Sequence, residues 1–286
     1  MTRTLVDARG KNFLPFRRPI RVVSLVPSLT ELLFDLGLTE AEVVGRTRFC
    51  VHPAGRVEKV PVVGGTKSFS TEEVLALRPE LVLANREENP KEAIEEIEET
   101  ENGPDAYVTD PTSLEEAVIM IRDLGVLVGR DAEAEAMAGR IEDLHHRLRP
   151  PSRGTALYLI WLRPYMSVAP GTYIHDMLRQ IGFTNAISPS YLKGCGHACP
   201  EAARYPELSL RDMVILNPRH ILLASEPFPF QHEHVERLRR ELAGVDEEFA
   251  ATVLIRLVEG EHYSWYGSRL EAALQSFIDE LSELDQ

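Results

Sequence analysis

The chain contains one sequence pattern twice, 139 positions apart. Residues 69–87 read FSTEEVLALRPELVLANRE, and residues 208–226 read LSLRDMVILNPRHILLASE. Each copy has a serine that can cap a helix, a Leu-x-Pro that ends the helix, an apolar run typical of a buried strand and a closing glutamate. Ligands of open α/β sheets bind at the carboxyl ends of such strands. The repeat therefore predicts two similar α/β lobes with a ligand cleft between them.

Length and charge limit the classes of function. The 286 residues suffice for two domains of about 100 to 150 residues each. The net charge of −14 argues against nucleic acid or an anionic membrane surface as the main partner. No apolar stretch approaches the roughly 18 residues of a membrane span. The three cysteines, an odd number, argue against a disulfide framework.

The N-terminal residues bear on the compartment. Residues 1–23 contain no apolar segment of a secretory signal, and no cysteine precedes Cys50 as a lipid-anchor site. These observations predict a cytoplasmic protein. A periplasmic or extracellular location is the alternative if the natural chain carries a leader that this sequence lacks.

Apolar periodicity and capping residues divide the chain into an N-terminal lobe (1–128), a linking helix (129–150) and a C-terminal lobe (151–286). In the first lobe we expect a helix that Ser28 begins by a capping box with Glu31, and strands near 21–25, 43–44, 62–63, 81–83 and 107–108. In the second lobe we expect strands at 156–161 and 252–258, and helices at 173–180, 231–242 and 268–284. The predicted fold class is α/β, with two Rossmann-like lobes of mainly parallel sheet joined by one long helix.

Three segments in this order resemble a known family: RVVSLVPSLTELLFDLG, VVGRTRFCVHP and VGGTKSFSTEEVLALRPELVLA. With the linking helix and second lobe, they are similar to the helical-backbone metal-receptor superfamily of periplasmic binding proteins for cobalamin, iron-siderophores and haem. The likeness runs from about Arg21 to Leu284. It is closest to the cobalamin-binding type, and especially to leaderless relatives with C-x-H-P, N-R-E-E-N and S-W-Y-G-S-R segments.

The resemblance implies non-catalytic binding of a cobalamin-like corrinoid or another metal chelate in the cleft, with no catalytic cofactor. It also makes an ABC permease a candidate partner, since importer-bound members dock through one acidic residue on each lobe. Glu72, beside Glu73, occupies the first of these positions. Arg211 occupies the second, next to Asp212, and this reversal of charge should weaken docking.

Candidate ligand-binding residues follow the predicted strands or lie in adjacent loops. In the first lobe they are Pro27, Ser28, Arg46, Gly65, Thr66, Lys67, Asn85, Arg86 and Glu87. In the second lobe they are Trp161, Tyr173, Glu226, Phe228, Trp265, Tyr266 and Arg269. Aromatic side chains suit a flat chelate, although Trp265 has packing under the final helix as its alternative role. For Arg269 two partners are open, an anionic ligand group or Glu261.

Cysteine and histidine residues form a second set of candidates, as metal ligands. They are Cys50, His52, Cys195, His197, Cys199 and His262. Their spacing matches no standard zinc module, and a buried, inert Cys50 is the alternative. One alternative function is therefore a cytoplasmic metal-ion or haem-binding protein. A chelatase-like enzyme is the other, but no nucleophile elbow, P-loop or acid–base pair is found, and we predict that the chain is not an enzyme.

Overall fold

The computed structural model describes residues 4–16, 19–194 and 204–284, and the chain divides into two compact units. Unit 1 consists of Met1–Pro111, Glu115–Asp143 and Tyr266–Glu271. Unit 2 consists of Thr112–Leu114, Leu144–Trp265 and Ala272–Gln286. The α/β fold class is confirmed by the sheets and helices of both units. The predicted domain boundaries after residues 128 and 150 stay a prediction.

Unit 1 is built on a four-stranded parallel sheet in the order β4-β3-β5-β6. Its strands are β3 (Val22–Ser24), β4 (Val43–Arg46), β5 (Leu81–Asn85) and β6 (Asp105–Thr109). Nearly all of their residues are buried, as continuous apolar runs predict for a parallel sheet covered on both faces. The expected strand near 62–63 is wrong: Val62 makes an isolated parallel bridge to Arg46. Pro61 cannot donate a ladder hydrogen bond, which limits pairing there.

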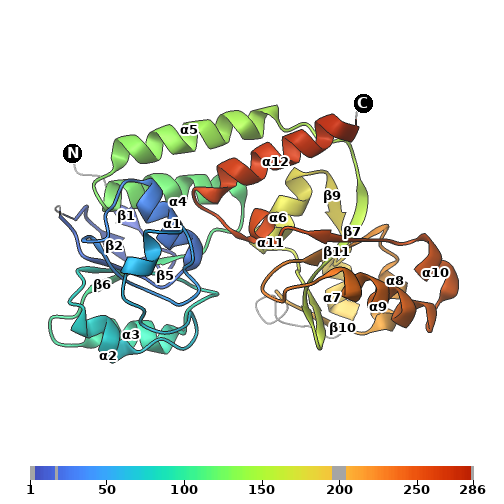
Figure 1. Cartoon of the computed structure of the whole chain (residues 1–286), viewed down its shortest axis with the longest axis horizontal. Helices are drawn as coiled ribbons and strands as arrows, with labels where there is room; N and C mark the ends of the chain where they lie inside the picture. Colours follow the sequence, from blue (N-terminus) through green and yellow to red (C-terminus); the bar gives the residue numbers. More distant parts are fainter. Residues whose placement is uncertain (1–3, 17–18, 195–203, 285–286) are drawn as a thin grey trace. The chain divides into compact units, whose positions relative to one another are not determined.

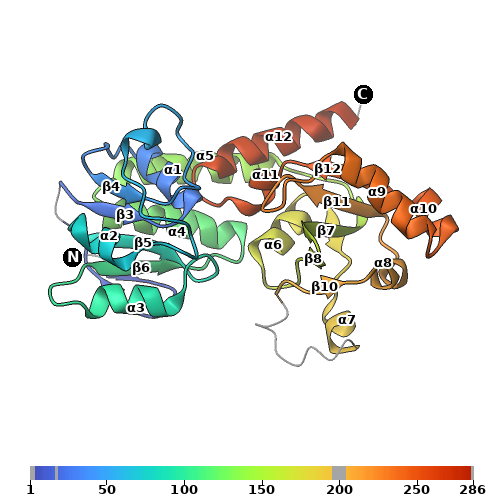
Figure 2. The same cartoon turned by 60° about the horizontal axis from the view of Figure 1, so that its bottom comes forward.

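Helices cover both faces of this sheet (Figures 1 and 2). On one face Val74, Ile94 and Ile97 from α2 (Thr71–Ala76) and α3 (Lys91–Glu99) pack on β-strand residues in one apolar cluster. On the other face lie α1 (Pro27–Asp35) and α4 (Leu114–Leu127). A short 3₁₀ helix, η1 (Val57–Lys59), follows β4.

The start of α1 differs from the prediction. The helix begins at Pro27, with Val26 as N-cap and no side-chain cap, so the Ser28–Glu31 capping box is wrong. Proline suits the first helical position because its φ is already helical and its missing N–H would have had no partner in the helix. Glu31 instead pairs with Arg269.

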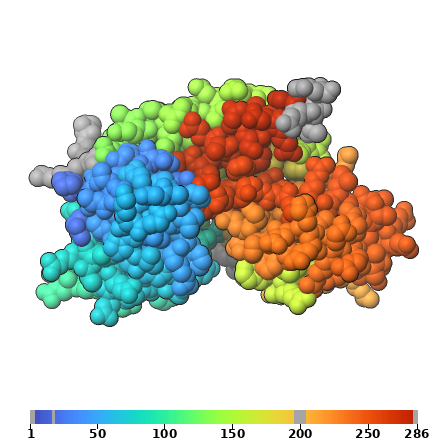
Figure 3. Space-filling view, viewed as in Figure 1, coloured from blue at the N-terminus to red at the C-terminus, as the bar shows by residue number. Residues whose placement is uncertain are grey.

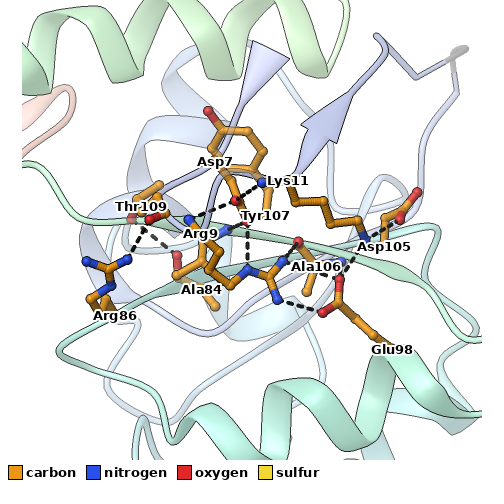
Figure 4. Close-up of polar contacts among 12 residues, drawn as sticks. Asp7, Arg9, Lys11, Ala84, Arg86, Glu98, Asp105, Ala106, Tyr107 and Thr109 are labelled. Carbon is orange, nitrogen blue, oxygen red and sulfur yellow. Dashed lines mark hydrogen bonds and ion pairs between the residues drawn. The ribbon is translucent and has the colours of Figure 1, made fainter. Parts of the chain in front are cut away.

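An N-terminal hairpin, which the sequence patterns did not predict, lies against β6. Its strands are β1 (Leu5–Val6) and β2 (Asn12–Phe13). The fully buried carboxylate of Asp7 accepts hydrogen bonds from the backbone N–H of Arg9, Lys11 and Val108 and from Arg9 Nε. Arg9 and Lys11 both pair with Glu98, as Figure 4 shows. The hairpin thus covers the exposed edge of the sheet.

Unit 2 contains a mixed sheet in the order β10-β8-β7-β11-β12, with β9 also paired to β7. The strands β7 (Gly154–Leu162), β9 (Phe183–Asn185), β11 (His220–Ala224) and β12 (Leu254–Val258) are parallel where they pair. The short strands β8 (Tyr165–Ser167) and β10 (Glu207–Leu208) add antiparallel pairs at one edge.

The helices of unit 2 pack around this sheet (Figure 2). Met213, Leu238 and Leu242 of α8 (Leu210–Leu216) and α9 (His232–Ala243) join Leu157, Leu159 and Ile221 in its core. The remaining helices are α6 (Tyr173–Gln180), α7 (Pro189–Gly194), α10 (Glu247–Thr252) and α11 (Gly260–Ser264). Two longer helices, α5 (Asp131–Arg147) and α12 (Arg269–Leu284), each include residues of both units.

The duplicated pattern has the predicted structure in both units. Ser70 caps α2 by accepting from the N–H of Glu73, and β5 follows Pro79. Ser209 caps α8 in a capping box with Asp212, and β11 follows Pro218. Each copy is therefore a capped helix, a stop and a buried strand.

The buried carboxylate of Asp7 leads to a prediction about stability. Asp7→Ala should lower the free energy of unfolding of unit 1 by about 2 to 4 kcal/mol, because it leaves buried donors without their charged acceptor. Urea unfolding followed by circular dichroism measures this. Asp105→Ala, which removes a side chain that is 50% exposed and paired with Lys11, should cost less than about 1 kcal/mol. Equal effects of the two substitutions would contradict the role given to Asp7.

Candidate functional site

The carboxyl ends of the four parallel strands place several predicted residues at one edge of unit 1. Pro27 and Ser28 follow β3, Arg86 and Glu87 follow β5, and the segment 65–67 joins them through Asn89. The Asn89 amide Nδ2 donates to the carbonyl oxygens of Thr66 (2.9 Å) and Leu25 (3.3 Å). This is the edge at which open parallel sheets bind ligands.

Two predicted ligand residues of this edge are buried and bonded to the protein. The Asn85 side chain accepts from the N–H of Glu87 (2.8 Å) and Glu88 (3.2 Å) and donates to the Thr109 carbonyl (3.0 Å). Arg46 donates to the carbonyl oxygens of Val57 (2.8 Å), Thr47 and Cys50 (both 3.1 Å). Both side chains therefore shape the loops around the edge. Ser28 is also buried, 6% exposed.

Arg48 and Phe49, which sequence reasoning missed, are exposed directly beyond β4. The Phe49 side chain is 51% exposed, and the Arg48 guanidinium lies 5.1 Å from its ring centroid. Figure 3 shows one face of the molecule, on which the blue surface belongs to unit 1. Arg86 was predicted because it follows a strand. Arg48 and Phe49 meet the same criterion, because β4 extends to Arg46 rather than ending at Val44.

Charged groups at this edge are partly paired. Arg86 makes an ion pair with Asp110 (3.0 Å) and also donates to the Ala8 carbonyl of the N-terminal hairpin, near the network of Figure 4. Burial raises the pKa of the Glu88 carboxyl, Lys67 opposes this rise, and Glu87 adds to it. Lys67 is exposed and Thr66 half-buried. The edge therefore offers both acidic and basic groups to a ligand.

The two aromatic residues predicted near the last helix are both buried, each 8% exposed. The Tyr266 hydroxyl hydrogen-bonds the Thr109 side chain, and burial raises its pKa. Arg269 makes a two-pronged ion pair with Glu31 (2.6 and 2.9 Å), a partner absent from the sequence-based alternatives. These contacts tie the Tyr266 and Arg269 side chains to unit 1, and ligand contact by Trp265, Tyr266 or Arg269 stays a prediction.

In unit 2 an aromatic ledge, defined here as Trp161, Phe228, Phe230 and His234, lies at the carboxyl ends of β7 and β11, with Trp161 next to the last residue of β7 and the other three after β11. Trp161 is 40% exposed and meets the Phe228 ring edge-on at 5.8 Å. Phe228 in turn contacts Phe230 (4.8 Å) and His234 (5.3 Å). The predicted Tyr173 is buried at the start of α6, 5% exposed. Trp161 thus presents a large aromatic face that neighbouring rings support.

Glu226 closes the second copy of the repeat as a half-buried carboxyl. It accepts hydrogen bonds from the Ser264 hydroxyl and the Trp265 indole, and burial raises its pKa. Ser225 donates to Glu259 and accepts from the Gly260 N–H. Acidic groups therefore line the ends of β11 and β12.

The candidate metal ligands fall into three places. The Cys50 thiol is buried between the hydroxyls of Thr30 (3.1 Å) and Thr47 (3.2 Å), and burial raises its pKa, which disfavours the thiolate. The His262 ring packs edge-on against Phe277. Cys195, His197 and Cys199 lie outside the described residues. Within the described ranges no cluster of three or more His, Cys, Asp or Glu residues is arranged to hold a metal ion. Metal ligation by Cys50, His52 or His262 stays a prediction.

The predicted docking positions carry opposite charges. Glu72 and Glu73 are exposed on the first turn of α2. Arg211 is exposed on the first turn of α8, and the Asp212 carboxylate is occupied by the N–H (2.7 Å) and hydroxyl (2.6 Å) of Ser209. The second position is therefore basic at its surface.

Comparison with known proteins gives one family and several relatives. The family model for "Periplasmic binding protein" matches residues 22–225. The vitamin B12-binding protein of Pectobacterium carotovorum subsp. carotovorum is 23% identical over 272 residues, 93% of this chain and 90% of that protein. An uncharacterized ABC transporter substrate-binding lipoprotein of Bacillus subtilis is 27% identical over 198 residues, 64% of this chain and 60% of that protein. The periplasmic heme-binding protein from Roseiflexus sp. RS-1 in apo form is similar in fold, with a TM-score of 0.69 and 23% identity over 93% of this chain and 99% of that one.

These comparisons correct the predicted compartment. The cytoplasmic location is wrong, because the matched family and the solved structure are periplasmic and one relative is a substrate-binding lipoprotein. The residues that build the two units do not encode the compartment. No helix in the described part of the chain is long and apolar enough to cross a membrane. All of these proteins are named for binding, which confirms the prediction that the chain is not an enzyme.

The raised pKa of Glu226 predicts a pH effect. Its folded-state pKa lies above the ordinary value of about 4.3, so its contribution to stability is present below that pH and is lost as pH rises through the folded pKa. Glu226→Gln, which cannot ionise, should therefore gain in melting temperature relative to the wild type as the pH rises from the ordinary glutamate pKa through the raised folded-state pKa.

Scanning calorimetry at several pH values measures this difference. Glu247→Gln, at an exposed position on α10, is the matched control and should leave the difference unchanged with pH. A constant difference for Glu226→Gln would show that its carboxyl is not destabilised by burial.

Proposed function

We propose, from the premise that the chain belongs to the periplasmic binding protein family, that it captures a metal chelate non-catalytically for import, with a cobalamin-like corrinoid as the first candidate. Membership rests on the match over residues 22–225 and confirms the resemblance seen in the sequence. Corrinoids come first because a vitamin B12-binding protein is similar over 93% of the chain. Haem is the second candidate, since a heme-binding protein shares the fold.

The observation that carries the proposal is the exposed ring of Trp161 at the carboxyl end of β7. Exposed indole rings at strand ends suit flat ligands, because a rigid aromatic face contributes contact area at low entropic cost. The Trp161 side chain is 40% exposed and contacts the Phe228 ring edge-on, and Phe228 itself packs against Phe230. The rest of the ledge therefore supports the ring without covering it.

Unit 1 has aromatic and charged side chains at its own strand ends. Phe49 adds a second exposed ring, and the 65–67 segment, which packs against that ring at Gly65, exposes the Lys67 side chain. Lys67, Glu87 and Glu88 supply donors and acceptors for the polar groups at the rim of a chelate. We propose that, of the ligand-binding residues predicted in unit 1, those that contact the ligand are Pro27, Thr66, Lys67, Arg86 and Glu87.

The other candidate functions fit the described residues less well. Thiolate ligation by Cys50 requires loss of a proton in a buried site that raises the pKa of the thiol. The chelatase alternative is set aside because the family consists of binding proteins. His52 is half-buried two residues after Cys50 and remains a candidate axial ligand in the proposal.

A substitution in the ledge tests the proposal. Trp161→Ala should weaken binding of hydroxocobalamin by about tenfold or more, because it removes most of an exposed aromatic contact. Titration followed by visible absorbance and by retention on a desalting column measures affinity and stoichiometry. Leu254→Ala is the matched control, since Leu254 is 38% exposed at the opposite, amino end of β12. Absence of binding to both hydroxocobalamin and haemin in the wild type would refute the proposal.

We further propose that an ABC permease is the partner and that docking is asymmetric. The Bacillus subtilis relative is named as a component of an ABC transporter. The exposed carboxylates of Glu72 and Glu73 suit basic residues of a permease, whereas Arg211 requires an acidic or neutral counterpart.

Charge reversals distinguish the two sides of docking. Glu72→Lys should weaken association with the cognate permease in proteoliposomes, measured by stimulation of its ATPase activity, because it places like charges together. Arg211→Glu should weaken it as well if the permease surface facing α8 is acidic. Stronger stimulation by Arg211→Glu would instead show a basic surface there and contradict asymmetric docking.

A further inference from the structure

Arg48 is an exposed cation without a counter-charge. Within the described ranges its side chain has no hydrogen bond or ion pair, and its contact is the stack over the Phe49 ring at 5.1 Å. Its neighbours on the same edge differ. Arg86 pairs with Asp110, and Arg46 donates to three carbonyl oxygens. Lys67 lies near enough to Glu88 to oppose the rise that burial causes in the pKa of the Glu88 carboxyl. The Arg48 guanidinium thus keeps its donors available on a chain with a net charge of −14.

The guanidinium is also held in one place. A Cβ atom built on Gly65 would lie 3.1 Å from Arg48 Nη2 and 3.3 Å from Phe49 Cε2, so both side chains pack directly on the glycine. The N–H of Arg48 donates to the Gly64 carbonyl (2.8 Å), which fixes its backbone to the same segment. Stacking of a planar guanidinium on an aromatic ring adds about 0.5 to 1 kcal/mol at an exposed site. These contacts favour one position of the guanidinium before any ligand binds.

We propose that Arg48 is a specificity-determining residue that binds an oxyanion substituent, a carboxylate or a phosphate, on the captured chelate. The inference rests on the proposed function and names the class of chelate within it. The guanidinium fork matches the two oxygens of either group, and Phe49 presents its ring to the flat part of the same ligand. Arg48 follows β4 at the edge where Lys67 and Glu87 also lie, so the anionic rim of the chelate faces this edge.

Two pairs of probes test the inference, because only one member of each pair carries the oxyanion; the cobinamide also lacks the ribose and the base, so in that pair the change caused by Arg48→Gln is the decisive quantity. The first is haemin, with two free carboxylates, against its dimethyl ester. The second is hydroxocobalamin, with one phosphodiester, against dicyanocobinamide, which has none. Dissociation constants from tryptophan fluorescence quenching are measured at two salt concentrations for the wild type, Arg48→Gln and Gly65→Ala. Lys91→Gln, which removes one exposed charge on α3, is the matched control.

In the pair that binds, the wild type should prefer the anionic member by about tenfold or more, as expected for a charge-assisted hydrogen bond. Arg48→Gln should bring this ratio close to one by weakening only the anionic member, and should remove its salt dependence. Gly65→Ala, whose added methyl group would press on Ser68 Oγ, the guanidinium and the Phe49 ring, should lower the ratio. Lys91→Gln should keep it. The pair in which the ratio appears identifies the carboxylate or the phosphate as the bound group.

Two outcomes overturn the inference in different ways. Equal binding of both members by the wild type, or an unchanged ratio in Arg48→Gln, leaves chelate binding intact and removes the role of Arg48. Absence of binding to all four probes overturns both this inference and the proposed function. Thermal unfolding of Arg48→Gln should show a loss of no more than about 1 kcal/mol, because the exposed side chain contributes only its stack on Phe49.

Discussion

The side chains of Asn85 and Asn89 hold the candidate ligand edge of unit 1 together. Asn89 accepts from the N–H of Asn85 (2.8 Å) and donates to the carbonyls of Leu25 and Thr66, while Asn85 accepts from the N–H groups of Glu87 and Glu88. Strand ends leave backbone donors and acceptors without ladder partners, and leaving them unpaired in a buried place is costly. This amide pair satisfies them and thereby joins the ends of β3 and β5 to the 65–67 segment. The positions of Lys67 and Glu87 depend on it.

Some charged side chains form ion pairs within the protein, and others lie partly buried or exposed at strand ends. The ion pair of Arg269 with Glu31 and the hairpin network around Asp7 use charged groups to join distant segments within unit 1. Glu88 and Glu226 are partly buried at strand ends, where burial raises the pKa of each carboxyl. Arg48 is the reverse case, an exposed cation that stacks on Phe49 and has no ion pair within the part of the chain that the structure describes. Such groups, kept at a cost or left unpaired at a ligand edge, are typical of binding sites.

The elements that were predicted well are those with strong local signals. The duplicated pattern predicted α2 with β5 and α8 with β11, and the apolar runs predicted β7 and β12 to within two residues. The elements that were missed, such as β8 and β10, have two or three residues and exist through their pairing partners. The burial of the candidate site residues was predicted less well. Arg46 and Arg48 are two positions apart, yet one is buried and the other exposed, and the prediction chose the buried one.

The sequence by itself determined the family and the α/β units, because caps, prolines and apolar periods act over a few residues and are read without knowing the fold. It also determined which strand ends carry polar and aromatic residues. Only the tertiary structure decided which of those side chains are used internally: Asn85 and Tyr266 are bonded to Thr109, and Arg269 to Glu31. Their partners lie 24 to 238 positions away along the chain. Such distant contacts decide whether a polar side chain forms hydrogen bonds within the protein or is available to a ligand, and no local sequence pattern contains them.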